Sequence, residues 1–386
     1  MGRWDRRMLI VLLVLVAVPI GLLVLFEPTP PSVTSIRFGP DSNTLALTYE
    51  VATCPATPLL YHISDQSTET LIPRAGETWF EVTVSPDGNS LAFVSSRLTS
   101  MKWKSGVWEE SRLVVVNRDE GDIQYISPTD YQVGFPTFDS SGKKIIFITR
   151  LKSKANMSAH LSGQIKISQD GISHLHDERI EQEYFPRYGV NDIDIRTGEI
   201  TTLIPAEFWR ISRAVPTSNG RYLYFIGAIS KQSKIVEREN RERHFINNGL
   251  FRYDYSTKEI VLMREILLAT LVAGNPSIDK SGTMLAYLKK SNRFWSSVIV
   301  SDPRSETDGS IFLTEPNMID LAVSPDGTTL AFLSDAKNFE LTFPTQLRQY
   351  GISVAHLNKD KVLRLGIPSL TFAQSMRPCR FYLRSY

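Results

Sequence analysis

The sequence predicts an all-β fold: a six-bladed β-propeller of four-stranded antiparallel blades, preceded by one N-terminal transmembrane helix. Two observations predict it. A hairpin pattern, with apolar alternation on both sides of a polar tight turn, recurs six times along the 386 residues. One long apolar run stands close to the amino terminus. Four-stranded units without a helical period between them are typical of blades that stand radially around an axis.

The apolar run Met8–Phe26 predicts a membrane span. It contains no charged residue, and at about 1.5 Å per residue it covers roughly 28 Å, close to the hydrocarbon thickness of a bilayer. Arg3, Arg6 and Arg7 before it favour a cytoplasmic amino terminus, which leaves the rest of the chain extracytoplasmic. The alternative is a cleaved signal peptide, but the run is longer than the apolar core of most signals. We therefore expect a signal anchor and a single-pass membrane protein.

The expected division of the chain follows from the anchor and the repeats. It is a cytoplasmic region at 1–7, an anchor at 8–26, a linker at 27–32, the propeller at 33–372 and a C-terminal tail at 373–386. The formal net charge is +2, and the first eight residues account for all of it. Because the remainder is balanced, the composition gives no support to a nucleic-acid partner.

Six copies of one hairpin carry the fold prediction. Each copy has an alternating apolar run, a polar turn and a second alternating run. The copies are SIRFGPDSNTLALT, VTVSPDGNSLAFVS, PTFDSSGKKIIFIT, AVPTSNGRYLYFIG, PSIDKSGTMLAYLK and LAVSPDGTTLAFLS. A second hairpin follows each copy, which completes four strands per unit. The turn positions are 46, 54, 78, 62 and 45 residues apart, so the longer spacings indicate insertions.

The turn of each copy has a defined chemistry. Its central position is Ser42 in the first copy and glycine in the other five, as expected where the backbone takes a positive φ. Aspartates one residue earlier are expected to accept hydrogen bonds from turn amides. We interpret all of these as structural residues: Asp41, Asp87, Gly88, Gly142, Gly220, Gly282, Asp326 and Gly327.

The phrases Ser85-Pro86-Asp87-Gly88 and Ser324-Pro325-Asp326-Gly327, each followed by a Leu-Ala-Phe strand, resemble the repeat of the TolB-like six-bladed propellers. The resemblance covers roughly residues 33–372. It does not extend to the α/β domain that precedes the propeller in TolB itself. The resemblance implies the fold, and it leaves the function open because this propeller serves many functions.

Strand parity predicts two different faces of the ring. The turns between the first and second strands lie on one face, here called the turn face. The links between the second and third strands lie on the opposite face, here called the insertion face. We expect five insertions there: Ser96–Ser111, Leu151–Tyr188, Ser230–Asn248, Lys289–Ser296 and Ser334–Gln349. Long loops on a rigid scaffold often bind a partner, although loops also vary where nothing constrains them.

Aromatic residues near this face are the candidate binding residues. Exposed tryptophans beside cationic side chains are typical of contacts with a protein or a glycan. The alternative is that each tryptophan fills space between blades. The candidates are Trp79, Trp103, Trp108, Trp209, Arg210 and Trp295.

The sequence contains none of the catalytic motifs by which an enzyme associated with a propeller is usually recognised. There is no G-x-S-x-G, no H-E-x-x-H, no P-loop and no G-x-G-x-x-G. His174 and His176 lack a defined third ligand, so a solvated loop is favoured over a zinc site. We therefore expect no enzyme, no metal and no cofactor, and a membrane-tethered module that binds a protein. The alternative is an enzyme or binding protein that takes a saccharide or another small ligand in the channel.

Two cysteines, Cys54 and Cys379, are expected on the same side of the propeller. In an exported protein they are candidates for a disulfide that closes a very long loop. The chain-entropy model gives such a bridge about 4–5 kcal/mol. Two free thiols are the alternative.

Overall fold

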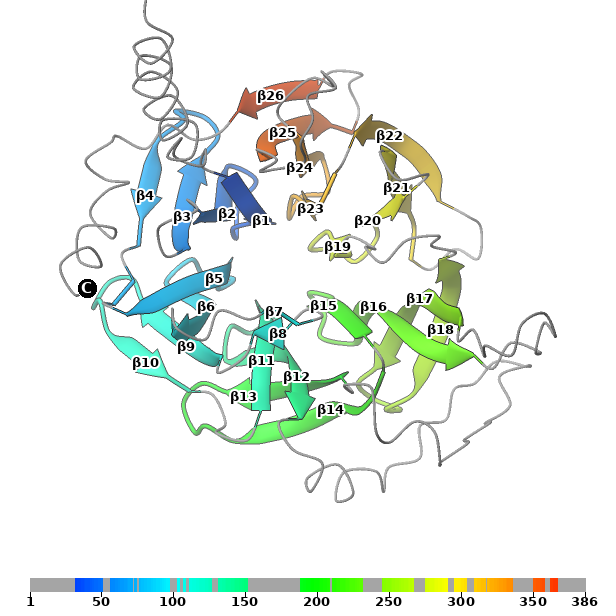
Figure 1. Ribbon diagram of the computed structural model, residues 1–386, viewed down its shortest axis with the longest axis horizontal. Helices are drawn as coiled ribbons and strands as arrows, with labels where there is room; N and C mark the ends of the chain where they lie inside the picture. The colour runs from blue at the N-terminus through cyan, green and yellow to red at the C-terminus, as the bar shows by residue number, and fades with distance from the viewer. Residues whose placement is uncertain are drawn as a thin grey trace, which may run out of the picture.

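The computed structural model describes the strands of the propeller and the tight turns between them (Figure 1). The described residues are 32–50, 56–71, 73–74, 76–97, 103–104, 107–108, 111–126, 131–151, 188–208, 210–231, 245–266, 275–290, 295–303, 309–316, 318–335, 350–357 and 362–366. The expected anchor and the expected tail lie outside these ranges. No helix in the described part of the chain is long and apolar enough to cross a bilayer.

The first three blades are four-stranded antiparallel sheets. Their strands are β1 (Ser32–Phe38), β2 (Thr44–Glu50), β3 (Thr57–His62) and β4 (Thr68–Thr70); β5 (Glu77–Val84), β6 (Ser90–Arg97), β9 (Arg112–Asn117) and β10 (Ile123–Tyr125); and β11 (Tyr131–Phe138), β12 (Lys144–Leu151), β13 (Tyr188–Asp194) and β14 (Ile200–Phe208). Between β6 and β9, the short strands β7 (Trp103–Lys104) and β8 (Val107–Trp108) pair as a separate hairpin.

The last three blades repeat the same order. Their strands are β15 (Arg210–Pro216), β16 (Tyr222–Lys231), β17 (Phe245–Asp254) and β18 (Ile260–Ile266); β19 (Ser277–Ile278), β20 (Leu285–Lys290), β21 (Trp295–Ser301) and β22 (Ser310–Pro316); and β23 (Asp320–Val323), β24 (Thr329–Asp335), β25 (Tyr350–His356) and β26 (Val362–Gly366). The predicted six-bladed propeller of four-stranded antiparallel blades is confirmed.

The hydrophobic core is divided among the junctions between blades. Alternating strand residues point to both faces of each sheet, so every blade offers apolar side chains to both neighbours. Six buried clusters result, and each joins two adjacent blades. In the cluster between the third and fourth blades, Phe208 packs edge-on against Phe225 and Phe251 at ring distances of 5.3 and 5.2 Å. The radial packing positions the inner strands around a central channel.

The ring closes between the sixth blade and the first by side chains. Among the described residues, no strand from one end of the chain pairs within the blade of the other end. Val33, Ile36 and Leu47 of the first blade instead pack with Ala331 and Ile352 of the sixth. Figure 1 shows β1 beside β23 and β24 at this junction. The amide of Ile36 also donates to Asp320 Oδ2 at 3.0 Å, a bond that joins residues from the two ends of the propeller.

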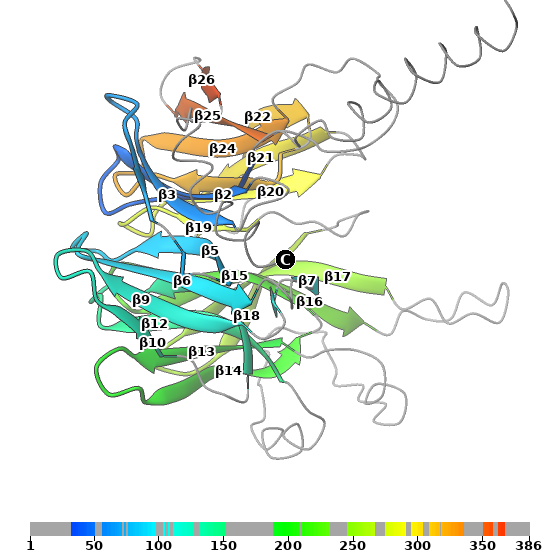
Figure 2. The same ribbon diagram turned by 60° about the vertical axis from the view of Figure 1, so that its left-hand side comes forward.

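The register of the strands separates the two faces as strand parity predicts. The inner strands end at the tight turns, which gather on one side of the ring in Figure 2. At the opposite end of the blades, the second strand ends where the third begins. The pairs at that end include Ser95 with Arg112, Arg150 with Tyr188, Lys231 with Phe245, and Asp335 with Tyr350.

Candidate functional site in the central channel

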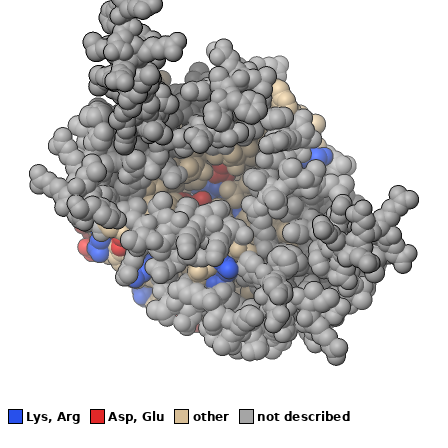
Figure 3. All heavy atoms as spheres, in the orientation of Figure 1, with Lys and Arg blue, Asp and Glu red and all other residues tan. Residues whose placement is uncertain are grey.

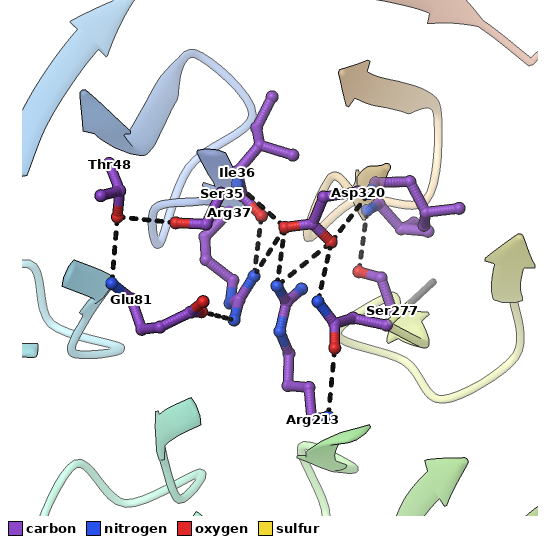
Figure 4. Close-up of polar contacts among 11 residues, drawn as sticks. Ser35, Ile36, Arg37, Thr48, Glu81, Arg213, Ser277 and Asp320 are labelled. Carbon is purple, nitrogen blue, oxygen red and sulfur yellow. Dashed lines mark hydrogen bonds and ion pairs between the residues drawn. The ribbon is translucent and has the colours of Figure 1, made fainter. Parts of the chain in front are cut away.

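One position of the repeat has a different residue in every blade, and in five of the six blades its side chain makes polar contacts. It lies seven residues before the turn position, and its occupants are Ser35, Glu81, Phe135, Arg213, Asn275 and Asp320. The inner strands β5, β11 and β15 have a register irregularity around this position. Glu81 and Phe135 have φ of 57° and 49°, the left-handed conformation that a bulge imposes. Because a bulge re-aims a side chain, Glu81 and Arg213 point toward the polar residues at the centre of the ring (Figure 4), whereas Phe135 packs in the core between the third and fourth blades.

Asp320 is the centre of a polar cluster that joins five blades (Figure 4). Its Oδ2 accepts hydrogen bonds from Arg213 Nη2 at 2.9 Å and from the Ile36 amide at 3.0 Å, and Arg37 Nη1 lies at 3.4 Å. Its Oδ1 accepts from Asn275 Nδ2 at 3.1 Å. We call Arg37, Glu81, Arg213, Asn275 and Asp320 the channel cluster.

Glu81 extends the channel cluster into the second blade. Its Oε2 lies 3.2 Å from Arg37 Nη2, and the two side chains are 12% and 9% exposed. The Glu81 amide donates to Thr48 Oγ1 at 3.0 Å, and the Ser35 hydroxyl donates to the same oxygen at 2.7 Å. The first and second blades are therefore joined by backbone and side chain together at this depth of the channel.

Burial dominates the electrostatics of the channel cluster. It raises the pKa of Glu81 to about 7, although the charge of Arg37 acts in the opposite direction. Burial also raises the pKa of Asp320, against the charge of Arg37 and the donors from Ile36 and Asn275. The pKa of Arg37 is lowered by burial, which the carboxylates of Asp320 and Glu81 oppose. Glu81 is therefore a group that both gains and loses its proton near neutral pH.

An axial cavity of about 240 Å³ opens from the channel cluster toward the turn face. All six blades line it with the residues that precede their turns, which places it on the axis of the ring. Its innermost ring lies five residues before the turn and consists of Arg37, Thr83, Thr137, Val215, Ser277 and Ala322. Arg37 is the one residue shared by the cavity lining and the channel cluster.

The channel is also hollowed on the side seen in Figure 3. Acidic and basic side chains lie at the floor of this hollow, among uncharged residues. The view has the orientation of Figure 1, so the hollow lies at the centre of the ring.

The predicted binding tryptophans have different environments. Trp79 is 2% exposed, stacks on Phe93 with ring centroids 4.3 Å apart, and donates from Nε1 to Glu77 at 3.0 Å. Trp79 therefore fills space in the core, which is the alternative interpretation of such a residue. A side chain this buried is not accessible to a partner. Trp295 is 44% exposed at the start of β21, on the insertion face.

The other candidates are described in part. The backbones of Trp103 and Trp108 pair across the β7–β8 hairpin, and Arg210 pairs with Ala228 in β15. Trp209 lies outside the described residues, as do Cys54, Cys379, His174 and His176, so the disulfide and the metal alternative stay predictions. Among the residues that the structure describes, no three His, Cys, Asp or Glu side chains gather to hold a metal ion.

The structural turn residues have the expected geometry. The five turn glycines have φ between 65° and 80°. Asp41 Oδ1 accepts from the amides of Asn43 and Thr44 at 3.0 and 2.6 Å. Asp87 and Asp326 accept in the same way from the amides of Asn89 and Thr328 at 3.1 and 3.0 Å.

Sequence reasoning missed the channel cluster, although a signal was present. The turn is the most regular part of the repeat, and the channel position lies outside it. Seven residues before the turn position, four of the six copies have a charged or amide residue, within strands that are otherwise apolar. A charged residue on a strand that is buried on both sides needs a partner, and only the channel brings six such positions together.

Comparison with solved structures supports the fold. No protein-family model and no curated protein matches the chain. Among solved structures, an oligogalacturonate lyase in complex with manganese is similar at a TM-score of 0.52 and 12% identity, over 88% of this chain and 78% of that one. A structure from a nidogen–laminin complex has a TM-score of 0.52 and 8% identity, over 83% and 92%. A putative TolB from Agrobacterium tumefaciens has a TM-score of 0.49 and 14% identity, over 78% and 88%.

The fold is a six-bladed propeller. Its six four-stranded blades carry that statement, its S-P-D-G turns resemble those of TolB-like propellers, and identities of 8 and 12% show the fold alone. The expectation that the chain is not an enzyme is wrong as an inference from missing motifs. A lyase has a similar fold over most of its length, so the lack of hydrolase or nucleotide-binding motifs does not exclude catalysis.

Proposed function

We propose that this chain is a membrane-tethered, extracytoplasmic propeller that binds a protein partner through its insertion face. The observation that carries the proposal is Trp295, a large aromatic side chain that is 44% exposed at the start of β21. Large exposed aromatics are enriched at the centres of protein interfaces, where they contribute most of the binding energy. The tryptophan lies at the end of the blade from which the long insertions leave.

The tether rests on the sequence. Met8–Phe26 is long and apolar enough to span a bilayer, and Arg3, Arg6 and Arg7 favour the orientation that exports the propeller. A propeller of similar fold comes from the structure of a nidogen–laminin complex. The fold is therefore compatible with recognition of another protein.

Site-specific photocrosslinking in cells that express the full chain tests the proposal. A photoreactive amino acid at Trp295 is expected to crosslink a discrete protein at least about fivefold more than one at Ile311. Ile311 is a matched control because it is 67% exposed on the same blade, at the opposite end. Trp295→Ser is expected to weaken capture of the crosslinked protein by about 30-fold, the effect of a typical hot-spot residue. Equal crosslinking at the two positions contradicts the proposal.

A second candidate function is an enzyme or binding protein that takes a saccharide or another small ligand in the channel. Glu81 favours it, because a carboxyl group with a pKa of about 7 exchanges its proton readily at neutral pH. An oligogalacturonate lyase has a similar fold. Turnover of oligogalacturonate by the purified chain, reduced about 100-fold or more in Glu81→Gln, is the expected result for this candidate. Unchanged turnover in the variant excludes Glu81 as its acid or base.

A further inference from the structure

We propose that the axial cavity on the turn face binds a small organic carboxylate, with Arg37 as the cation that anchors it. This site goes beyond the partner-binding function, because it lies at the opposite end of the channel from the insertion face.

The cavity has a fixed wall because of its position on the axis of the ring. Residues from all six blades line it, at the same repeat positions in each blade. Six packed blades hold these residues, so the wall is preformed. The innermost ring contains one charged residue, Arg37, whose side chain is 9% exposed. A ligand that enters from the turn face therefore meets a single cationic residue at the deep end, and its Nε has no hydrogen-bond partner among the described residues.

The acidic residues of the wall are already engaged. Asp139 accepts from the Lys144 amide at 3.0 Å and from the Ser141 hydroxyl at 2.7 Å. Asp279 accepts from the amides of Thr283 and Met284 at 2.9 and 2.8 Å, and from the Ser281 hydroxyl. Both carboxylates therefore act as caps of their turns, and Asp279 accepts four hydrogen bonds in doing so.

Hydrogen-bond donors remain in the wall. The buried hydroxyl of Thr137, in the same ring as Arg37, has no hydrogen-bond partner in the described structure. Lys280 is exposed at the cavity rim. A wall with spare donors, and with carboxylates that cap their own turns, favours a ligand that accepts hydrogen bonds and carries negative charge.

The channel cluster behind Arg37 is short of negative charge. Arg37 and Arg213 share the carboxylate of Asp320, so Glu81 is the second counter-ion. Burial raises the pKa of Glu81 to about 7, and below that pH two cations face one carboxylate. An anion in the cavity restores the balance, so binding and protonation of Glu81 favour each other. Lower pH is therefore expected to strengthen binding.

The size and the apolar part of the wall define the ligand further. A volume of about 240 Å³ corresponds to roughly eight water-sized groups. Phe38, Phe138, Val84 and Val323 line it together with prolines. These side chains suit a short apolar body attached to the carboxylate. Benzoate has this size and chemistry, and benzamide is its uncharged counterpart.

Saturation-transfer NMR with the full chain in detergent tests the site, with benzoate and benzamide as probes. Benzoate is expected to bind at least about tenfold more tightly than benzamide, and about tenfold more tightly at pH 6 than at pH 8. Arg37→Gln is expected to weaken benzoate binding by about tenfold or more. Equal binding of the two probes, or binding of neither, overturns the proposal.

A rim variant keeps the test valid if Arg37→Gln does not fold. Ser218 is exposed and lines the cavity mouth, so Ser218→Trp is expected to block the cavity without touching the cluster. Asn89→Trp is the matched control, since Asn89 is exposed at another turn outside the lining. Loss of benzoate binding in Ser218→Trp alone supports the site, and equal binding in both variants overturns it.

The carboxylate has two natural sources, a free metabolite or the carboxyl terminus of a peptide. Acetyl-Ala-Ala-Phe with a free carboxyl group, compared with its amide, distinguishes them. Tighter binding of the free peptide than of benzoate assigns the site to a chain terminus. Tighter binding of benzoate assigns it to a small acid.

Discussion

Two rings of repeat positions lie one above the other along the inner strands, and the six blades treat them differently. At the turn, five of six copies keep a glycine, and its φ stays between 65° and 80°. Seven residues earlier, the six copies have six different residues. The turn must satisfy the same backbone geometry in every blade. The side chain at the channel position must match the charge and hydrogen-bonding groups of its partners from other blades. These partners differ from blade to blade, so the residue differs too.

The carboxylates of the two rings differ in the same sense. Asp87 and Asp326 are solvated, and hydrogen bonds from Ser85 and Ser324 hold the pKa of each below its ordinary value. Burial instead raises the pKa of Glu81 and of Asp320. The carboxylates of the turns are therefore ionised caps of local structure. The carboxylates at the channel position are buried, where water screens their charge less.

The largest expected effect is the loss of Asp320. Asp320→Ala leaves Arg213, 1% exposed, without its counter-ion and removes the bond to the Ile36 amide across the ring junction. Removing one partner of a buried ion pair typically costs about 3–5 kcal/mol of unfolding free energy. Urea unfolding of the full chain measures it.

Asp326 provides the control for this substitution, because it lies in the same blade on the turn ring. Asp326→Ala removes the bond to the Thr328 amide and is expected to cost about 1 kcal/mol. Equal losses of stability in the two variants contradict the distinction between the rings.

Glu81 is expected to give the next largest effect, as a dependence of stability on pH. Its pKa is raised in the folded state from 4.5 to about 7, so between these values the folded chain binds more protons than the unfolded chain. Stability from this group is therefore present below about pH 4.5 and is lost as the pH rises through 7, by about 2–3 kcal/mol. Unfolding at pH 5 and pH 8 measures the loss.

Glu81→Gln isolates this contribution from the other carboxylates, because Gln does not titrate. The difference in stability between pH 5 and pH 8 is expected to shift by about 2–3 kcal/mol relative to the unmodified chain. Glu69→Gln is the matched control, since Glu69 pairs with Arg118 at the surface, with side chains 42% and 33% exposed. A shift of the same size in Glu69→Gln argues against a special environment for Glu81.

The sequence was sufficient for the scaffold and insufficient for the channel. Turn glycines and alternating strands are local signals, so six blades and the parity of their ends were predictable from Gly88 and its equivalents. The partners of Arg37 are not local. Asp320 lies almost three hundred residues away, and only closure of the ring brings the two together. The prediction that Trp79 is an exposed binding residue is wrong for a related reason. The sequence places Trp79 near the end of an inner strand, but it does not show that the indole ring packs on Phe93.

The smallest expected effect separates backbone geometry from packing at turn glycines. Gly327 has a φ of 72°, and an added Cβ lies 3.3 Å from Asp279 Oδ2. Gly121, in the outer turn between β9 and β10, has a φ of 71° with no atom within 4 Å of an added Cβ. Both alanine variants incur the left-handed strain of about 1 kcal/mol, and Gly327→Ala also displaces the carboxylate that caps the fifth blade. Gly327→Ala is therefore expected to be the more destabilising by about 1 kcal/mol in thermal unfolding. Equal effects indicate that φ alone selects glycine at the turn, and that contact between neighbouring blades adds nothing to it.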